Sequence, residues 1–169
     1  METTLKLHSL TYRESRTYIF AALFAVGNIL LPQLLHLVPS GGLTWLPVYF
    51  FTLIAAYKYG LNVGLLTAIL SPLANSLLFG MPAAEMLPMI LMKSALLAVV
   101  AAYAAHYAKK VSLPVIVAAV LTAQLLGMVI EWAVLRDFFM ALQKVQIAIP
   151  GILLQIFGGY LVLRAIRHL

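Results

Sequence analysis

The feature that most constrains this chain is a series of apolar runs separated by short polar connectors. A single apolar run can be the buried helix of a soluble core. A series of runs near twenty residues each implies helices that cross a bilayer, because the hydrocarbon core needs about 20 apolar residues per span. Six candidate runs are present, at residues 17–38, 43–57, 61–79, 86–107, 113–135 and 147–163.

Composition supports the same interpretation, because 64% of the 169 residues are hydrophobic and only 9% are charged. A soluble domain of this size cannot bury so large an apolar fraction. We therefore predict an all-α integral membrane protein with a single transmembrane domain over residues 1–169. Residues 1–16 would form a cytoplasmic amphipathic N-terminal segment, and residues 17–169 a bundle of six transmembrane helices. The absence of cysteine excludes disulfides and thiolate chemistry.

The distribution of lysine and arginine predicts the orientation of the spans. With the N-terminus inside, the cytoplasmic segments hold eight of these residues, and the outer connectors hold only Arg136 and Lys144. The positive-inside rule then places both termini in the cytoplasm. The net charge of +6 follows mostly from this bias. We expect no nucleic-acid partner, because no aromatic residues interleave with a basic groove.

Polar side chains gather in the outer halves of the predicted spans. Such groups are costly in hydrocarbon unless they face a bundle interior or a wet cavity, so their clustering predicts a pocket that opens outward. Proline also falls in the outer halves of five spans, where backbone that lines a cavity tolerates kinks. The polar residues are Gln33, His36, Tyr49, Asn75, Lys93, Gln124, Glu131 and Gln155.

Lys93 is the most informative of these candidates. It lies about eight residues into the fourth predicted span, which is about 12 Å deep at about 1.5 Å per residue, so its stem cannot easily carry the charge to water. One interpretation is a structural ion pair with Glu131, near the outer end of the fifth span. The other is a counter-charge for an anionic group of a ligand. Glu131 itself fits either a binding site or an interfacial position beside Trp132.

Two interpretations also exist for the other candidates. Trp45 and Tyr49 lie at the depth of an aromatic belt, or they stack on a ligand. The remaining amide side chains and His36 either form interhelical hydrogen bonds or line the pocket. We predict no metal site and no cofactor, because His36 has no second histidine or carboxylate at ligand spacing.

Small residues mark one face of the first span. Ala21 and Ala25 stand at i and i+4 in "AALFA". A flat ridge of this kind lets another helix approach closely.

Several segments together resemble the substrate-binding S component of an energy-coupling factor (ECF) vitamin transporter. The resemblance covers nearly all six spans, and it is strongest in the "FGMP" pattern of spans two to four and in "PGILLQ" of the sixth. The segments are "AALFA", "GGLTWLPVYFFTLIAAYKYGLNVGLLTAILSPLANSLLFGMP", "MLPMILMKSALLAVVAAYAA" and "PGILLQIFGGYLV".

The resemblance implies a partner surface and a pocket. In that family the small-residue motif of the first span meets the coupling helices of a shared membrane subunit, which implies that Ala21 and Ala25 contact a partner. The pocket is formed on the outer side by the loop after the first span and by spans four to six. Relatives tend to have histidine in the "LP" motif of span two and glutamate in span four. This chain has Tyr49 and Lys93 there, which reverses the charge of a pocket-facing position.

The implied function is the capture of a small water-soluble vitamin or related micronutrient for ATP-driven uptake. The chain would act in the inner (cytoplasmic) membrane of a bacterium or archaeon. It has no "GxxxxGK[ST]" phosphate loop, so it cannot hydrolyse ATP itself. The implied partners are an ECF transmembrane coupling subunit and two ATP-binding subunits.

Two other classes of protein are alternatives. A scaffold of the cell-shape machinery similar to MreD has comparable length and six spans, but it would need neither a buried lysine nor a polar outer pocket. A small intramembrane enzyme is disfavoured, because no Ser/His/Asp set, metal constellation or paired carboxylate stands at workable spacing. We therefore do not expect an enzyme.

Overall fold

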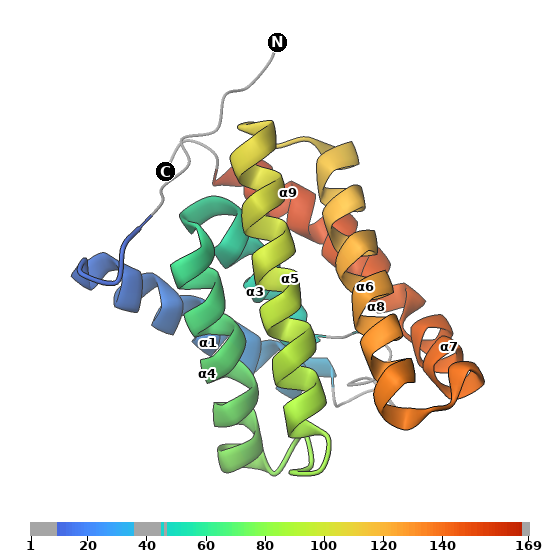
Figure 1. Cartoon of the computed structure of the whole chain (residues 1–169). Coiled ribbons are helices and arrows are strands. Elements are labelled where there is room, and N and C mark those ends of the chain that lie inside the picture. The colour runs from blue at the N-terminus through green and yellow to red at the C-terminus, as the bar shows by residue number, and fades with distance from the viewer. Residues whose placement is uncertain (1–9, 36–44, 46, 167–169) are drawn as a thin grey trace.

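The structure, a computed structural model, describes residues 10–35, 45 and 47–166, and most of them are helical. Every regular element in these ranges is a helix (Figure 1). One of them, η1, is a π-helical turn. In chain order the elements are α1 (Ser15–Leu35), α3 (Pro47–Tyr59), α4 (Leu61–Phe79), α5 (Leu87–Ala108), α6 (Leu113–Leu135), α7 (Phe138–Ile147), α8 (Ile149–Leu153), η1 (Leu154–Gly158) and α9 (Gly159–Ala165).

The helices form one bundle around α3. Helices α4, α5 and α6 stand side by side, and α1 crosses them at a steep angle (Figure 1). Helix α3 is buried along nearly its whole length, because α1, α4 and α5 all pack against it. After α6 the chain turns at Arg136, packs back against α6 as α7, and continues through α8 and η1 to α9.

Four of the described helices are long and apolar enough to cross a membrane: α1, α4, α5 and α6. A fifth span is possible if α7 and the stretch from α8 to α9 count as one, although the two parts are bent by 55°. Helix α3 has 13 residues, fewer than the roughly 20 that a full crossing needs. The fold is thus that of an all-helical, multi-pass membrane protein, and six spans with both termini inside stay a prediction.

The outward face of α1 supports a lipid environment. Its exposed large side chains follow one another every three or four residues along one side of the helix. A soluble protein seldom exposes so long an apolar stripe, whereas lipid tails solvate it at no cost. The stripe includes Ile19, Leu23, Val26, Leu30 and Leu34.

The segment after α6 differs from the prediction. Residues 136–144 were expected to be a connector, but most of them belong to α7. Asp137 is the N-cap of this helix, and its Oδ1 accepts a hydrogen bond from the Met140 backbone N–H at 3.0 Å. Capping of this type compensates for backbone donors that a helix start leaves free. The polar connector is thus reduced to Arg136 and Asp137.

The sixth predicted span is also interrupted. The chain bends between α7 and α8 around Ala148, just before Pro150. Proline at the start of a helix is tolerated, because the first N–H groups have no intrahelical partner. The π-helical turn η1 follows within one turn of Pro150. The bend thus falls at the start of the predicted run 147–163, and the rest of the run is one continuous helical stretch that contains the π-helical turn.

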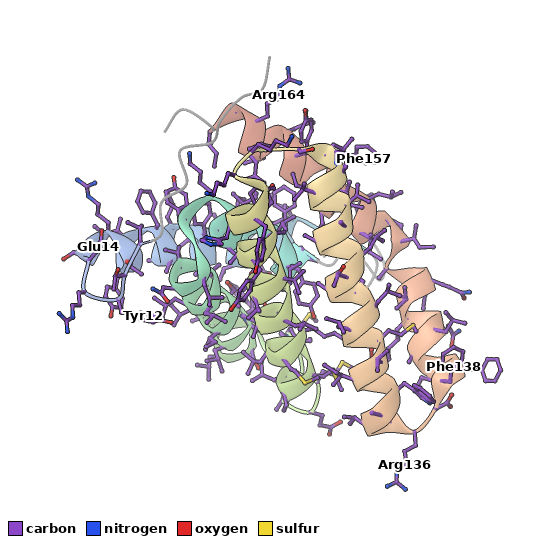
Figure 2. The ribbon with its side chains drawn as sticks, turned by 45° about the horizontal axis from the view of Figure 1, so that its top comes forward. Tyr12, Glu14, Arg136, Phe138, Phe157 and Arg164 are labelled. Carbon is purple, nitrogen blue, oxygen red and sulfur yellow. The ribbon has the colours of Figure 1, made fainter. Side chains whose placement is uncertain are left out.

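The two ends of the bundle differ in charge. At one end the Tyr57 hydroxyl donates to the Lys110 carbonyl at 2.8 Å, and Asn62 Nδ2 donates to the Leu10 carbonyl at 2.8 Å. Lys58 and Lys109 also belong to this end. The opposite end holds the short connection between α4 and α5 and the turn at Arg136. Figure 2 shows Arg164 and Arg136 at these opposite ends.

This arrangement makes the orientation testable. We expect a reporter that is active only in the cytoplasm to be active when fused after Lys110 and inactive when fused after Gly80, because the positive residues gather at the first of these ends. Reporter activity normalised to the amount of fusion protein is the measurement. The opposite pattern would place the charged site described below on the cytoplasmic side.

Candidate functional site

A cluster of three charged side chains joins α5, α6 and α7. Glu131 on α6 is 2% exposed. Lys93 Nζ on α5 donates to Glu131 Oε2, and Lys144 Nζ on α7 donates to Glu131 Oε1 at 2.7 Å. The lysine side chains are 22% and 47% exposed, respectively. The cluster therefore connects a buried carboxylate to the surface near the end of the bundle that holds Arg136.

The charges in this cluster do not balance. Two ammonium groups and one carboxylate leave a net charge of +1. Each carboxylate oxygen already accepts a hydrogen bond from one lysine, whereas an ammonium group has three donors. Lys93 and Lys144 therefore keep donors for a further acceptor, and an anion would satisfy both the charge and the hydrogen bonds.

Helix α6 allows the Lys93 stem to lie across its surface. Gly127 stands one turn before Glu131, and a Cβ atom built there would lie 3.4 Å from Lys93 Cγ and 3.5 Å from Cε. These distances are ordinary van der Waals contacts, so the aliphatic part of the lysine lies against this face of α6. This close packing directs the ammonium group to Glu131.

Lys144 was not among the residues predicted from sequence to form the site. It had been placed in an outer connector, and the formation of α7 turns it toward Glu131 instead. The available signal was Asp137, a residue type favoured at helix starts, followed by "FFMALQKVQI". The pair Lys93 and Glu131, which sequence did predict as one alternative, is present.

The other candidates have no hydrogen bond or ion pair with this cluster among the described residues. Tyr49 is buried in the first turn of α3. Trp45 is half-buried. Gln124 is half-buried on α6, about two turns before Glu131. His36 lies outside the described residues.

Asn75 belongs to a different group of polar side chains, centred on Asn28 of α1. Asn28 Nδ2 donates to Thr52 Oγ1 at 3.0 Å and to Ser71 Oγ at 3.1 Å, and Asn28 Oδ1 accepts from the Phe51 N–H at 3.0 Å. Ser94 Oγ on α5 lies 3.4 Å from Thr52 Oγ1. Four helices are therefore joined by one buried network that sequence reasoning did not predict.

Pro32 explains one bond of this network. Proline has no N–H, so the carbonyl four residues earlier loses its helical donor. That carbonyl belongs to Asn28, and Asn75 Nδ2 donates to it at 3.0 Å. Asn75 Nδ2 also donates to the Ser71 carbonyl at 3.1 Å. The first of these bonds is interhelical and the second lies within α4, while the buried Asn75 Oδ1 has no hydrogen-bond partner among the described residues.

Gln155 on η1 is a buried amide of another kind. Its side chain is 0% exposed. Neither Nε2 nor Oε1 has a hydrogen-bond partner among the residues that the structure describes. Buried side-chain amides in folded proteins nearly always form hydrogen bonds, so this residue requires an explanation.

The structure places Ala21 and Ala25, which are predicted to contact a partner subunit, inside the bundle. Ala21 and Ala25 are both buried, and Ala21 belongs to the apolar core. Their small size lets α1 approach its neighbours within the bundle. They present almost no exposed area in the isolated chain, and their contact with another subunit stays a prediction.

No described group of three or more His, Asp or Glu side chains could hold a metal ion. No family model, curated protein or solved structure matches this chain. The functional proposal therefore depends on the site geometry and on the sequence pattern.

Proposed function

We propose that this protein is the substrate-capture subunit of an ECF-type importer and binds a small, water-soluble, anionic vitamin or related micronutrient. The observation that carries the proposal is the excess positive charge of Lys93 and Lys144 around the buried Glu131. Intramembrane ionisable groups are costly and usually mark a substrate path. A carboxylate or similar anion would bind between the two ammonium groups.

The proposed partners supply the energy. An ECF transmembrane coupling subunit and two ATP-binding subunits would drive release of the solute into the cytoplasm of a bacterium or archaeon. The predicted orientation places the charged cluster at the outer end, where solute would enter. The resemblance implies that the loop after the first span would cover the bound solute.

Mass spectrometry of small molecules that co-purify with the protein tests this proposal. We expect a stoichiometric, water-soluble compound with an acidic group. A scaffold similar to MreD would co-purify with lipid but with no such compound. Absence of a bound compound, together with unchanged uptake of vitamins on deletion of the protein, would contradict the proposal.

The substitution Lys93→Met tests the site itself. We expect the co-purified compound to bind about 30-fold more weakly, since a hydrogen bond to a charged group contributes about 2 kcal/mol. The protein should stay folded and monodisperse, because Lys144 still neutralises Glu131. Isothermal titration is the measurement, and Lys109→Met, at the far end of the bundle, is the control. Unchanged affinity in Lys93→Met would remove Lys93 from the site.

A further inference from the structure

Two buried amides in this chain have opposite environments. Asn28 uses both Nδ2 hydrogens and Oδ1 in hydrogen bonds. Gln155, equally buried, has no partner for Nε2 or Oε1 within the described part of the chain. Leaving a buried donor and acceptor unsatisfied costs free energy, which makes this amide a candidate for pairing with a bound molecule.

The backbone around Gln155 holds its side chain toward the interior. Gln155 lies on the π-helical turn η1, and such turns are frequent at functional sites. Two glycines follow in close packing with α3: a Cβ at Gly158 would lie 2.9 Å from Phe50 Cε2, and one at Gly159 would lie 3.0 Å from Leu53 Cδ2. Phe157, two residues away from Gln155, instead points outward from the bundle (Figure 2).

The same turn lies beside the helices that carry the charged site. Element η1 packs against α3 and α6. Tyr49 precedes Phe50 on α3, and Glu131 lies on α6. Gln155 is therefore a buried residue of an element that packs against the two helices carrying Tyr49 and Glu131.

We propose that Gln155 is a specificity residue that recognises a planar donor and acceptor edge of the substrate, such as a lactam, a cyclic urea or an imide. Its Nε2 would donate to a ligand carbonyl, and its Oε1 would accept from the adjacent ligand N–H. This inference rests on the proposed function, because it assumes that Lys93 and Lys144 bind the anionic group of the same molecule. The substrate class is then a small anion with a ring amide.

The stability of the ligand-free protein gives the first test. We expect Gln155→Leu to leave the thermal midpoint unchanged or to raise it, because the substitution removes two unsatisfied polar atoms and keeps the volume. Asn28→Leu, the matched control, should lower the midpoint, since its amide is fully hydrogen-bonded. If Gln155→Leu lowers the midpoint as Asn28→Leu does, Gln155 is a structural residue and the proposal is wrong.

Binding of three small probes gives the second test. Orotate has a carboxylate and an imide edge, benzoate has the carboxylate alone, and uracil has the edge alone. At about 10 mM a ligand with a Kd of about 1 mM raises the midpoint by about 3–6 °C. We expect orotate to stabilise the wild-type protein more than benzoate or uracil does. In Gln155→Leu, orotate should bind about tenfold more weakly, and benzoate should bind as before.

The outcomes separate this inference from the proposed function. Equal stabilisation by orotate and benzoate, or an orotate preference that persists in Gln155→Leu, would overturn the role of Gln155 and leave the anion site intact. If neither carboxylate stabilises the wild-type protein, the anion site fails, and the inference fails with it.

Discussion

Glu131→Gln is expected to lower the free energy of unfolding by about 3 kcal/mol. The wild-type carboxylate is buried and accepts hydrogen bonds from both Lys93 and Lys144. The amide keeps the volume of the side chain but not its charge, so two ammonium groups stay close together without a counter-ion. Removing one member of a buried ion pair costs about 3–5 kcal/mol, and the partial exposure of the lysines favours the lower value. The unfolding midpoint of the purified protein in detergent is the measurement.

A double variant shows whether the unpaired lysine charges cause this loss of stability. Lys93→Met added to Glu131→Gln should recover part of the loss, because only the half-exposed Lys144 then lacks a partner carboxylate. Lys144→Met alone should cost less than about 1 kcal/mol, since exposed ion pairs contribute little. Equal stability of Glu131→Gln and the wild-type protein would show that the lysines do not depend on the carboxylate.

Asn28→Leu is expected to lower the free energy of unfolding by about 2–3 kcal/mol. The Asn28 side chain donates to Thr52 and Ser71 and accepts from the Phe51 N–H. Interhelical hydrogen bonds in membrane proteins contribute about 0.6 kcal/mol each on average. The leucine also leaves the Phe51 N–H without this acceptor, which adds a desolvation cost. Thermal unfolding in detergent, followed by circular dichroism, measures the loss.

Thr67→Val is the matched control for the network. Thr67 is as buried as Asn28, but its hydroxyl donates only within its own helix, to the Val63 carbonyl at 2.9 Å. Valine has nearly the same shape, so we expect a change below about 1 kcal/mol. If Asn28→Leu costs no more than Thr67→Val, the network does not hold the four helices together.

These two predictions concern different parts of the interior. The network around Asn28 has a partner for each of that residue's side-chain donors and acceptors, so it is suited to fixing the helix positions. The cluster around Glu131 has excess charge and spare donors, and Gln155 has no described partner. Under the proposed function, the spare donors of this cluster and the Gln155 amide would pair with the bound ligand.

Most of the long helices could be predicted from the sequence. The runs 61–79 and 113–135 coincide with α4 and α6, and the run 86–107 differs from α5 by one residue at each end. Glycine, proline and polar residues at the ends of these runs are typical helix-terminating residues, so the helix ends could be predicted as well. The pair of Lys93 and Glu131 was also predictable, because each needs a partner at its depth.

Only the tertiary structure decided how these helices meet. Sequence spacing shows that Ala21 and Ala25 share a face of α1, but packing against the bundle buries that face and exposes the opposite one. The third member of the charged cluster, Lys144, reaches Glu131 because α7 forms and packs against α6. The hydrogen bonds of Asn28 and the lack of described partners for Gln155 depend on atoms from helices far apart in the chain. The length of an apolar run and the positions of lysine and arginine are local properties of the sequence, and the bilayer acts on them directly. The pairing of buried polar groups depends instead on which helix faces come together.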